Sequence, residues 1–207
     1  MADAEFFFDP VCPWAWITSR WTEEVASQRH YEVDWRFIAL RFVNDDKYKD
    51  LPPRYMESHT LGLRMLRVAA AAKSDGGPQA AGAVYTAVGG AIHVGGRRDE
   101  LATADGVGSV LKDAGLDPGL AAAADEDRWD DVIRTDTEAA LERTGRDVGT
   151  PIITFGPPDG PSFFGPVISR IPRGQEALEL WDATERIARF PGFAELKRAL
   201  RERPQTS

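Results

Sequence analysis

Residues 1–40 carry the pattern of two strands joined by a helix. Residues 5–9 are largely aromatic and predict a short buried strand, whereas apolar residues at four-residue spacing predict a helix from Pro13 to about Ser27. Apolar and polar residues then alternate over residues 31–37, which predicts a second strand. A crossover of this kind is right-handed and pairs its strands in parallel. The turn after the first strand is therefore expected at the carboxyl edge of the sheet, where open α/β sheets place their functional sites.

Cys12, the only cysteine in 207 residues, lies in this turn. Pro13 suits the first position of a helix, so the thiol is predicted to lie at a helix N-terminus. Free N–H groups and the helix dipole stabilise a thiolate there, which lowers the pKa of the thiol and makes it a nucleophile. An isolated cysteine is more often an inert buried residue. The preceding strand, Pro13 and the aromatic flank at Trp14 favour a reactive thiol instead.

Composition narrows the possible environments and partners. A single cysteine excludes an intramolecular disulfide and favours a reducing compartment, and residues 1–8 lack the basic and apolar segments of a signal peptide or membrane span. We therefore expect a cytoplasmic protein with no membrane contact. The net charge of −8 and the scattered basic residues argue against nucleic acid as a partner. The separated histidines predict no metal site, and no glycine-rich phosphate loop indicates a nucleotide.

The middle of the chain differs from its two ends in composition and in predicted secondary structure. Residues 41–146 are rich in alanine and in helix boundaries and have almost no strand pattern. A Gly-Gly-Pro sequence at residues 76–78 separates two helices, and Gly145 ends the last one. This predicts a helical insertion over residues 41–146 between two parts of one α/β domain, residues 1–40 and residues 147–207.

Strand patterns return in the C-terminal part. Residues 151–164 predict a β-hairpin around a Pro-Pro-Asp-Gly turn, and residues 174–189 predict an amphipathic helix. A second short helix is expected over residues 193–201, and the tail after Arg203 is expected to be loose.

The order strand, helix, strand, helical insertion, hairpin and helix resembles a thioredoxin-like fold with the inserted α-helical subdomain of the DsbA family. The sequence C-P-W-A at residues 12–15 is similar to the C-P-W-C motif of that family, with Ala15 in place of the second cysteine. The sequence V-G-T-P directly precedes the returning strand, where thioredoxin folds keep a cis-proline. The resemblance therefore implies a cis bond between Thr150 and Pro151 that faces Cys12.

Three segments resemble more closely the actinobacterial mycothiol-dependent reductases of this family, some of which act as nitroreductases: residues 8–21, 147–151 and 163–174. The resemblance extends over nearly the whole chain. It implies mycothiol or another low-molecular-weight thiol as co-substrate, a small molecule or mixed disulfide as second substrate, and no tightly bound cofactor. In a C-x-x-C site the second thiol releases the substrate. Because Ala15 cannot do this, Cys12 is expected to act as a monothiol that a second small-thiol molecule frees.

The same resemblance suggests residues that contact the substrate. Thr150 and Pro151 would form the lip opposite Cys12. Polar residues near the edges of the helical insertion are further candidates: Asn44, Tyr55 and His93. A histidine close to the thiol would stabilise a thiolate or donate a proton, although an ordinary core or surface histidine is an equal alternative. The adjacent Arg97 and Arg98 are interpreted as a solvated loop pair rather than as an anion site.

The function predicted from these features is that of a thiol-disulfide oxidoreductase with a single nucleophilic cysteine, acting on mixed disulfides or small electrophiles. Two alternatives stay open. Kappa-type glutathione transferases and hydroxychromene-carboxylate isomerases share this fold and insertion but activate a bound thiol, and they commonly have serine at the position of Cys12. A non-catalytic binding module is the other alternative, and it would have an unperturbed thiol pKa. The oligomeric state is not specified by the sequence.

Overall fold

The computed structural model describes residues 2–207. At its centre lies a four-stranded sheet in the order β2-β1-β3-β4. β1 pairs in parallel with β2 and antiparallel with β3, and β3 pairs antiparallel with β4. The strands are β1 (Ala4–Phe8), β2 (Val33–Phe37), β3 (Ile152–Phe155) and β4 (Ser162–Phe164). Every residue of β1 is buried, which suits its run of three phenylalanines, because both faces of the strand are covered.

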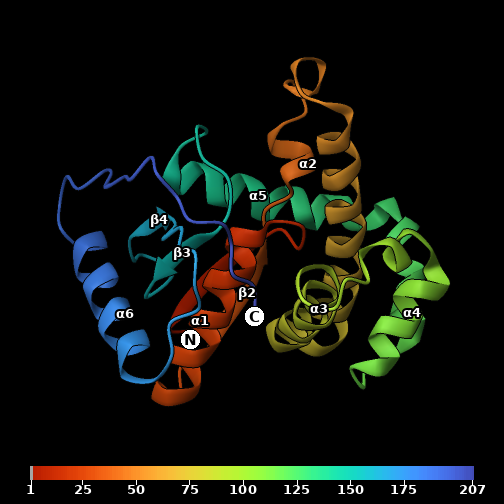
Figure 1. The fold of residues 1–207 in the computed structure, drawn as a ribbon, viewed down its shortest axis with the longest axis horizontal. Helices are drawn as coiled ribbons and strands as arrows, with labels where there is room; N and C mark the ends of the chain where they lie inside the picture. Colours follow the sequence, from red (N-terminus) through yellow and green to blue (C-terminus); the bar gives the residue numbers. More distant parts are fainter. Residues whose placement is uncertain (1) are drawn as a thin grey trace.

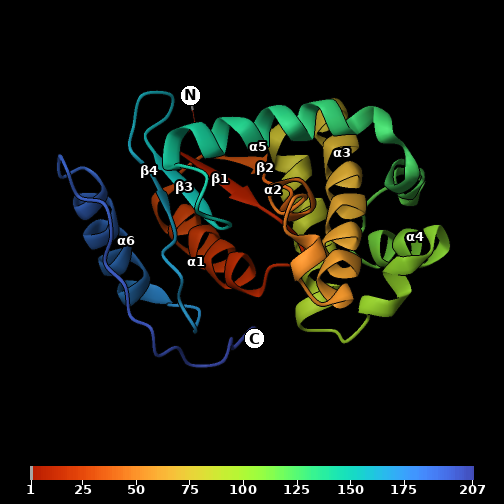
Figure 2. The same cartoon turned by 90° about the horizontal axis from the view of Figure 1, so that it is seen from above.

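Helices cover both faces of the sheet, and the period of two along β1 divides its aromatic side chains between them. Phe6 and Phe8 belong to the main core, which contains residues of α1 (Pro13–Arg29) and α6 (Gly174–Ala188). Phe7 belongs instead to a smaller core with residues of α5 (Asp130–Thr144). Figure 2 shows the sheet between α5 on one side and α1 on the other.

Only helices connect β2 to β3 (Figure 1). Besides α5 they are α2 (Leu40–Val43), α3 (Pro53–His93), α4 (Ala104–Asp113) and the 3₁₀-helices η1 (Tyr48–Asp50), η2 (Arg98–Ala102), η3 (Pro118–Asp125) and η4 (Asp127–Trp129). The predicted helix break at residues 76–78 is confirmed as a kink in α3, where Gly77 has a φ of 72°. Glycine is suited to this left-handed conformation because it has no Cβ.

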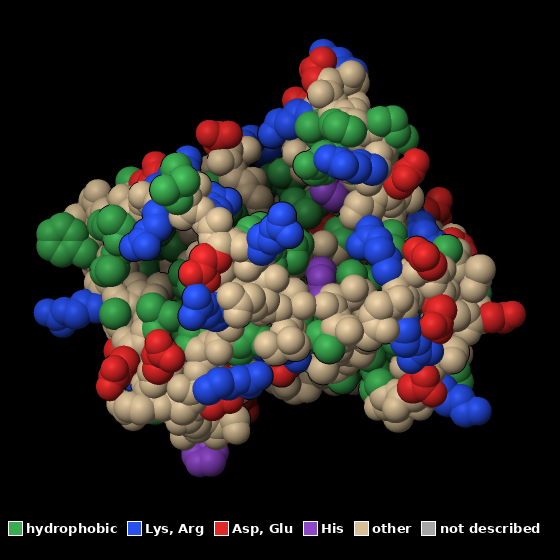
Figure 3. Space-filling view, viewed as in Figure 1, with side chains coloured by type: hydrophobic (Ala, Val, Ile, Leu, Met, Phe, Trp, Pro, Cys, Tyr) green, Lys and Arg blue, Asp and Glu red, His purple; other side chains and the backbone are tan. Residues whose placement is uncertain are grey.

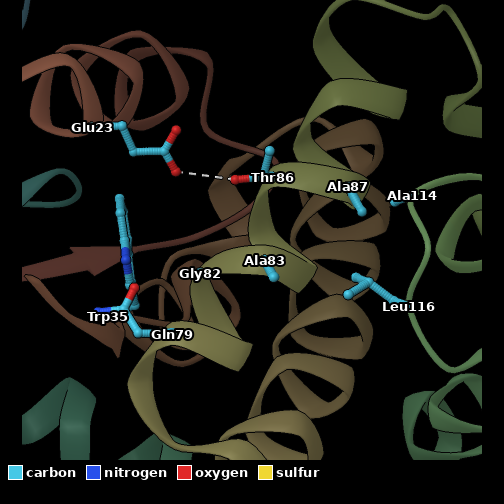
Figure 4. Close-up of a pocket in the computed structure, with 9 residues that line it drawn as sticks. All are labelled: Glu23, Trp35, Gln79, Gly82, Ala83, Thr86, Ala87, Ala114 and Leu116. Atoms are coloured by element: carbon cyan, nitrogen blue, oxygen red, sulfur yellow. Dashed lines mark hydrogen bonds between the residues drawn. The ribbon is translucent and has the colours of Figure 1, made fainter. Parts of the chain in front are cut away.

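α3 approaches the sheet closely because small residues face it. A Cβ added to Gly82 would lie 2.6 Å from the indole of Trp35, which Figure 4 shows beside this turn of α3. Residues of α3 thereby join the same hydrophobic core as β1 and α1. The architecture is the expected thioredoxin-like fold with a helical insertion. Its division into residues 1–40, 41–146 and 147–207 stays a prediction.

The C-terminal segment differs from the sequence-based expectation. The helix predicted over residues 193–201 is wrong, since these residues form neither helix nor strand. Leu196 and Leu200 are 83% and 88% exposed, so a short helix here would have no surface on which to bury its apolar face. The tail after Arg203 is not loose either, because the backbone N–H of Gln205 donates to the carbonyl of Ser169 at 2.8 Å.

Within residues 2–207, no helix combines the length and the apolar character needed to cross a lipid bilayer.

Candidate active site

Cys12 caps the N-terminus of α1, where the sequence predicts it. Its backbone is extended, with φ −82° and ψ 114°, and Pro13 occupies the first helical position. The Cys12 Sγ accepts a hydrogen bond from the Ala15 N–H at 3.5 Å. This N–H has no intrahelical carbonyl to bond because it belongs to the first turn. The sulfur therefore takes the place that a serine or aspartate oxygen fills at many helix N-termini.

The opposite lip of the site comes from the segment that precedes β3. The Cys12 Sγ lies 3.5 Å from the Thr150 carbonyl oxygen and donates to it. The Thr150 hydroxyl donates to the Phe7 carbonyl at 3.0 Å, which ties this segment to β1. The Thr150–Pro151 peptide bond is cis. Pairing of β1 with β3 thus brings together residues that are 138 positions apart in the chain.

A buried carboxylate supports the turn that carries Cys12. Asp9 has no exposed surface, and its two oxygens accept hydrogen bonds from the backbone N–H groups of Val11 at 3.1 Å and Leu40 at 2.8 Å. Burial raises the pKa of Asp9 to about 7, although both hydrogen bonds favour the anion. Gly62 of α3 leaves space for this carboxylate, since a Cβ there would clash with it. Asp9 was not predicted from the sequence as a site residue, although an acidic residue three positions before Cys12 could have indicated a charge close to the thiol.

The Cys12 thiol is more deeply buried than its position at a helix N-terminus suggests. It is 8% exposed, and burial raises its pKa to about 12. The Ala15 N–H lowers the pKa, whereas the negative charge of Asp9 raises it further. The predicted low thiol pKa is therefore wrong for this conformation, because loss of hydration outweighs the stabilisation by the helix N-terminus. Cys12 is protonated here at neutral pH.

His93, at the end of α3, contacts the active-site turn through the backbone. Its Nε2 lies 2.8 Å from the Pro10 carbonyl oxygen, which can only accept, so Nε2 carries the proton. Burial lowers the pKa of His93 to about 4, so the ring is neutral at pH 7. The ring also stacks on Trp16 of α1, with 5.7 Å between the centroids. His93 therefore holds the turn and α1 together through contacts with Pro10 and Trp16.

The other predicted substrate residues lie at different places, and only Asn44 and Trp14 are linked to the turn. Asn44 follows α2, and its side-chain amide donates to the Leu40 carbonyl at 2.9 Å. The N–H of the same Leu40 donates to Asp9, so Leu40 links Asn44 to the buried carboxylate. Tyr55, in the first turn of α3, is 41% exposed and lies edge-on to the His59 ring at 6.1 Å. Trp14 is half-buried directly beside Cys12.

The C-terminal tail crosses the N-terminal end of α1 and ends between α1 and α3 (Figures 1 and 2). The Trp16 indole N–H donates to the Thr206 carbonyl at 3.0 Å, and the Thr206 hydroxyl donates to the His93 carbonyl at 2.7 Å. Arg170 forms an ion pair with Glu202, in the preceding part of the tail, at 2.9 Å. The tail therefore covers the two aromatic residues that support the active-site turn.

Removal of residues 205–207 is expected to make Cys12 more reactive. Without the tail, water reaches Trp16 and His93, and these two side chains hold the active-site turn less firmly. Water then reaches the thiol more easily, so we expect its pKa to fall toward the ordinary value. We expect the rate of iodoacetamide alkylation at pH 8 to rise roughly threefold to tenfold, since one pKa unit changes the thiolate fraction tenfold. Thr206→Ala, which loses one of the two hydrogen bonds, should give a smaller increase. An unchanged alkylation rate in the truncated protein would show that the tail does not limit access to the thiol.

Asp9→Asn is expected to move the titration of Cys12 to lower pH. The variant removes the negative charge that raises the thiol pKa, so the midpoint of the alkylation rate against pH should fall by up to about one unit. Asp45→Asn is the matched control, because Asp45 is exposed and pairs with Arg41. An equal shift in both variants, or no shift in Asp9→Asn, would contradict the electrostatic coupling of Asp9 to Cys12.

Comparisons with known proteins agree with this architecture. The model of a family described as "Rv2466c-like: Mycothiol-dependent nitroreductase Rv2466c" matches residues 11–198. Uncharacterized protein Rv2286c from Mycobacterium tuberculosis (strain ATCC 25618 / H37Rv) is 30% identical over 200 residues, which cover 96% of this chain and 82% of that protein.

Similar solved structures have much lower sequence identity. The cytosolic disulfide reductase DsbM from Pseudomonas aeruginosa has a TM-score of 0.51 and 19% identity, with 77% of this chain and 86% of that chain covered. A candidate protein disulfide isomerase from Nitrosomonas europaea has a TM-score of 0.51 and 12% identity, with 87% and 95% covered. At this identity the two structures show the shared fold. The family model, by contrast, spans most of the chain, and we conclude that the chain belongs to the Rv2466c-like family.

Proposed function

We propose that the protein is a cytoplasmic thiol-disulfide oxidoreductase that uses Cys12 as its single nucleophile and mycothiol as its low-molecular-weight thiol. The observation that carries this proposal is the position of the Cys12 Sγ, at the N-terminus of α1 and 3.5 Å from the Thr150 carbonyl beside a cis-proline. Membership in a family described as mycothiol-dependent supports thiol-dependent redox chemistry and the choice of thiol.

The proposed reaction exchanges one disulfide for another. The Cys12 thiolate attacks the mycothiol sulfur of a mixed disulfide, a bond forms between the two sulfurs, and the partner leaves as a thiolate that takes up a proton. The thiolate of a second mycothiol molecule then attacks the mycothiol sulfur bound to Cys12. This step releases mycothiol disulfide and regenerates the Cys12 thiolate. The second mycothiol is required because Ala15 provides no thiol and the chain has no other cysteine.

The residues around Cys12 have different proposed roles in this reaction. The Ala15 N–H stabilises the thiolate when it forms and when it leaves. Trp14 is half-exposed beside the sulfur and contacts the apolar part of the substrate. Thr150 and Pro151 bind the substrate on the opposite side, while Asn44, Tyr55 and His93 shape the entrance. The thiol must become hydrated or contact a substrate before it ionises, since burial keeps its pKa high in this conformation.

The test is direct detection of the intermediate. The protein is incubated with mycothiol disulfide at pH 8, and the intact mass is measured. We expect one mycothiol attached per chain, and its release when free mycothiol is added. A chain that stays unmodified with excess reagent, although its Cys12 reacts with iodoacetamide after unfolding, would overturn the proposal.

A second candidate is a transferase or isomerase that activates a bound thiol. The raised pKa of Cys12 favours it, because a protonated buried thiol is a poor nucleophile. Such an enzyme would keep its activity when Cys12 is replaced, but would require added thiol. The proposed oxidoreductase would lose its activity under the same conditions.

A further inference from the structure

A groove lies between the first turns of α3 and η2. It has a volume of about 840 Å³, which is in the range of small-molecule sites. Its apolar wall includes Tyr55 and Met56, which are 41% and 43% exposed. Arg98 of η2 lines it on the other side. Figure 3 shows one face of the molecule, which is hollowed and carries Lys and Arg side chains around the hollow.

Within the described part of the chain, Arg98 has no carboxylate partner, in contrast to Arg64 and Arg97 nearby, and unlike the exposed Arg54 it is partly enclosed by the protein. It is half-buried, and its Nη2 donates to the Ser58 hydroxyl at 2.7 Å. Among residues 2–207 no acidic side chain lies within ion-pair distance of it, although Glu57 and Asp99 line the same groove. The preceding Arg97 pairs with acidic side chains at 2.8 Å on two sides. The interpretation as a solvated pair therefore suits Arg97 but not Arg98.

A half-buried cation without a counterion is unusual in a chain with a net charge of −8. Burial of a charge is costly unless an opposite charge compensates it. A planar guanidinium binds a carboxylate through two parallel hydrogen bonds, and only one of its nitrogens is used by Ser58 here. The remaining N–H groups of Arg98 are therefore suited to a carboxylate supplied by a ligand.

The charge of Arg98 also reaches the active-site turn. It favours the anionic form of Asp9 and contributes to the lowered pKa of His93 and His59. Asp9 and the Pro10 carbonyl that His93 contacts directly precede Cys12 in the turn. Gly62 of α3 lies against the Asp9 carboxylate, and Ser58, which Arg98 contacts, precedes Gly62 by about one helical turn. A ligand bound at Arg98 would therefore lie close to the turn that carries Cys12.

We propose that this groove is the substrate subsite of the reaction and that it selects substrates with an aromatic or apolar body and a carboxylate group. The carboxylate pairs with Arg98, and the body contacts Tyr55 and Met56. This inference rests on the proposed function, because it assumes that the ligand in the groove is the molecule with which Cys12 reacts.

The test compares two aromatic disulfides that differ in charge: 5,5′-dithiobis(2-nitrobenzoate), with a carboxylate on each ring, and neutral 4,4′-dithiodipyridine. In both reactions the Cys12 thiolate attacks one sulfur, the disulfide bond breaks, and an aromatic thiolate leaves and is followed by absorbance. In Arg98→Gln the reaction with the dianionic reagent should slow about five- to tenfold. The reaction with the neutral reagent should change less than about twofold, because this reagent has no carboxylate for Arg98 to bind.

Arg97→Gln is the matched control, since it removes the same charge one residue away from a side chain that already has two carboxylate partners. Both reagents should react with it at the rate of the natural protein. Equal slowing of the dianionic reagent in the two variants would indicate general attraction by positive charge and would overturn the subsite. Equal slowing of both reagents in Arg98→Gln would place the effect in the fold or the thiol, and would also overturn it.

Equilibrium binding separates failure of the subsite from failure of the proposed function. Binding of 4-nitrobenzoate, measured by titration calorimetry, requires no reactive thiol. We expect binding to the natural protein and to Arg97→Gln, and a loss of about fivefold or more in affinity for Arg98→Gln. If the disulfides fail to react but 4-nitrobenzoate binds in this pattern, the thiol chemistry is wrong and the anion site stands. Absence of binding to the natural protein would overturn the site.

Discussion

Cys12→Ser is expected to lose thiol exchange, with a decrease of at least about a thousandfold, as for other enzymes that lose a covalent nucleophile. A serine hydroxyl does not exchange with a disulfide, and the chain contains no second cysteine that can replace Cys12. Serine should preserve the structure of the turn, because it is a preferred residue at helix N-termini and can accept the Ala15 N–H in place of the sulfur. Loss of activity would then report chemistry rather than unfolding.

The measurement is the rate at which a mixed disulfide of mycothiol is reduced, together with the intact mass of the protein after the reaction. Circular dichroism and urea unfolding check that the variant is folded. Cys12→Ala should be equally inactive, although it loses the cap of α1 as well. Activity of Cys12→Ser that persists and depends on added thiol would contradict the proposed nucleophile and would favour the transferase or isomerase.

Gly89→Ala is expected to destabilise the protein by about 1–3 kcal/mol, the usual cost of overfilling a packed core. A Cβ at Gly89 would lie 2.5 Å from the indole of Trp16, which is 4% exposed. Trp16 cannot move freely, because its ring stacks on His93 and its N–H bonds to Thr206. Displacement of this indole should therefore also disturb the turn before Cys12, and the alkylation rate of the thiol should change together with stability.

The adjacent Gly90→Ala is the matched control. The nearest atom to a Cβ at Gly90 is 3.9 Å away, in the same indole, which is an ordinary contact. Alanine forms helices more readily than glycine, so Gly90→Ala should stabilise α3 by about 0.5–1 kcal/mol. Urea unfolding measures both variants. Equal changes in the free energy of unfolding would contradict the close packing of α3 against α1.

Several features of the fold could be predicted because they depend on neighbours in the sequence. Alternation along residues 31–37 indicated the strand β2, and the Gly-Gly-Pro sequence indicated the kink in α3. Pro13 indicated that a helix begins directly after Cys12. The helix predicted over residues 193–201 does not form, because its stability depends on distant parts of the chain. Its apolar spacing was suitable, but no surface of the protein is available to bury its apolar face.

Local sequence was thus sufficient to place Cys12 at the start of a helix, at the carboxyl edge of a parallel pair of strands. The environment of the Cys12 thiol could not be predicted from the sequence, because this environment depends on residues that are distant from Cys12 in the chain. Thr150 faces the sulfur only after β1 and β3 pair, and Thr206 covers Trp16 only after the tail returns to α1. Burial of Cys12 in the folded protein reverses the expected direction of the thiol pKa. Arg97 and Arg98 are adjacent in the sequence, but only Arg97 forms ion pairs within residues 2–207. This difference depends on which carboxylates the fold brings within a few ångströms of each guanidinium.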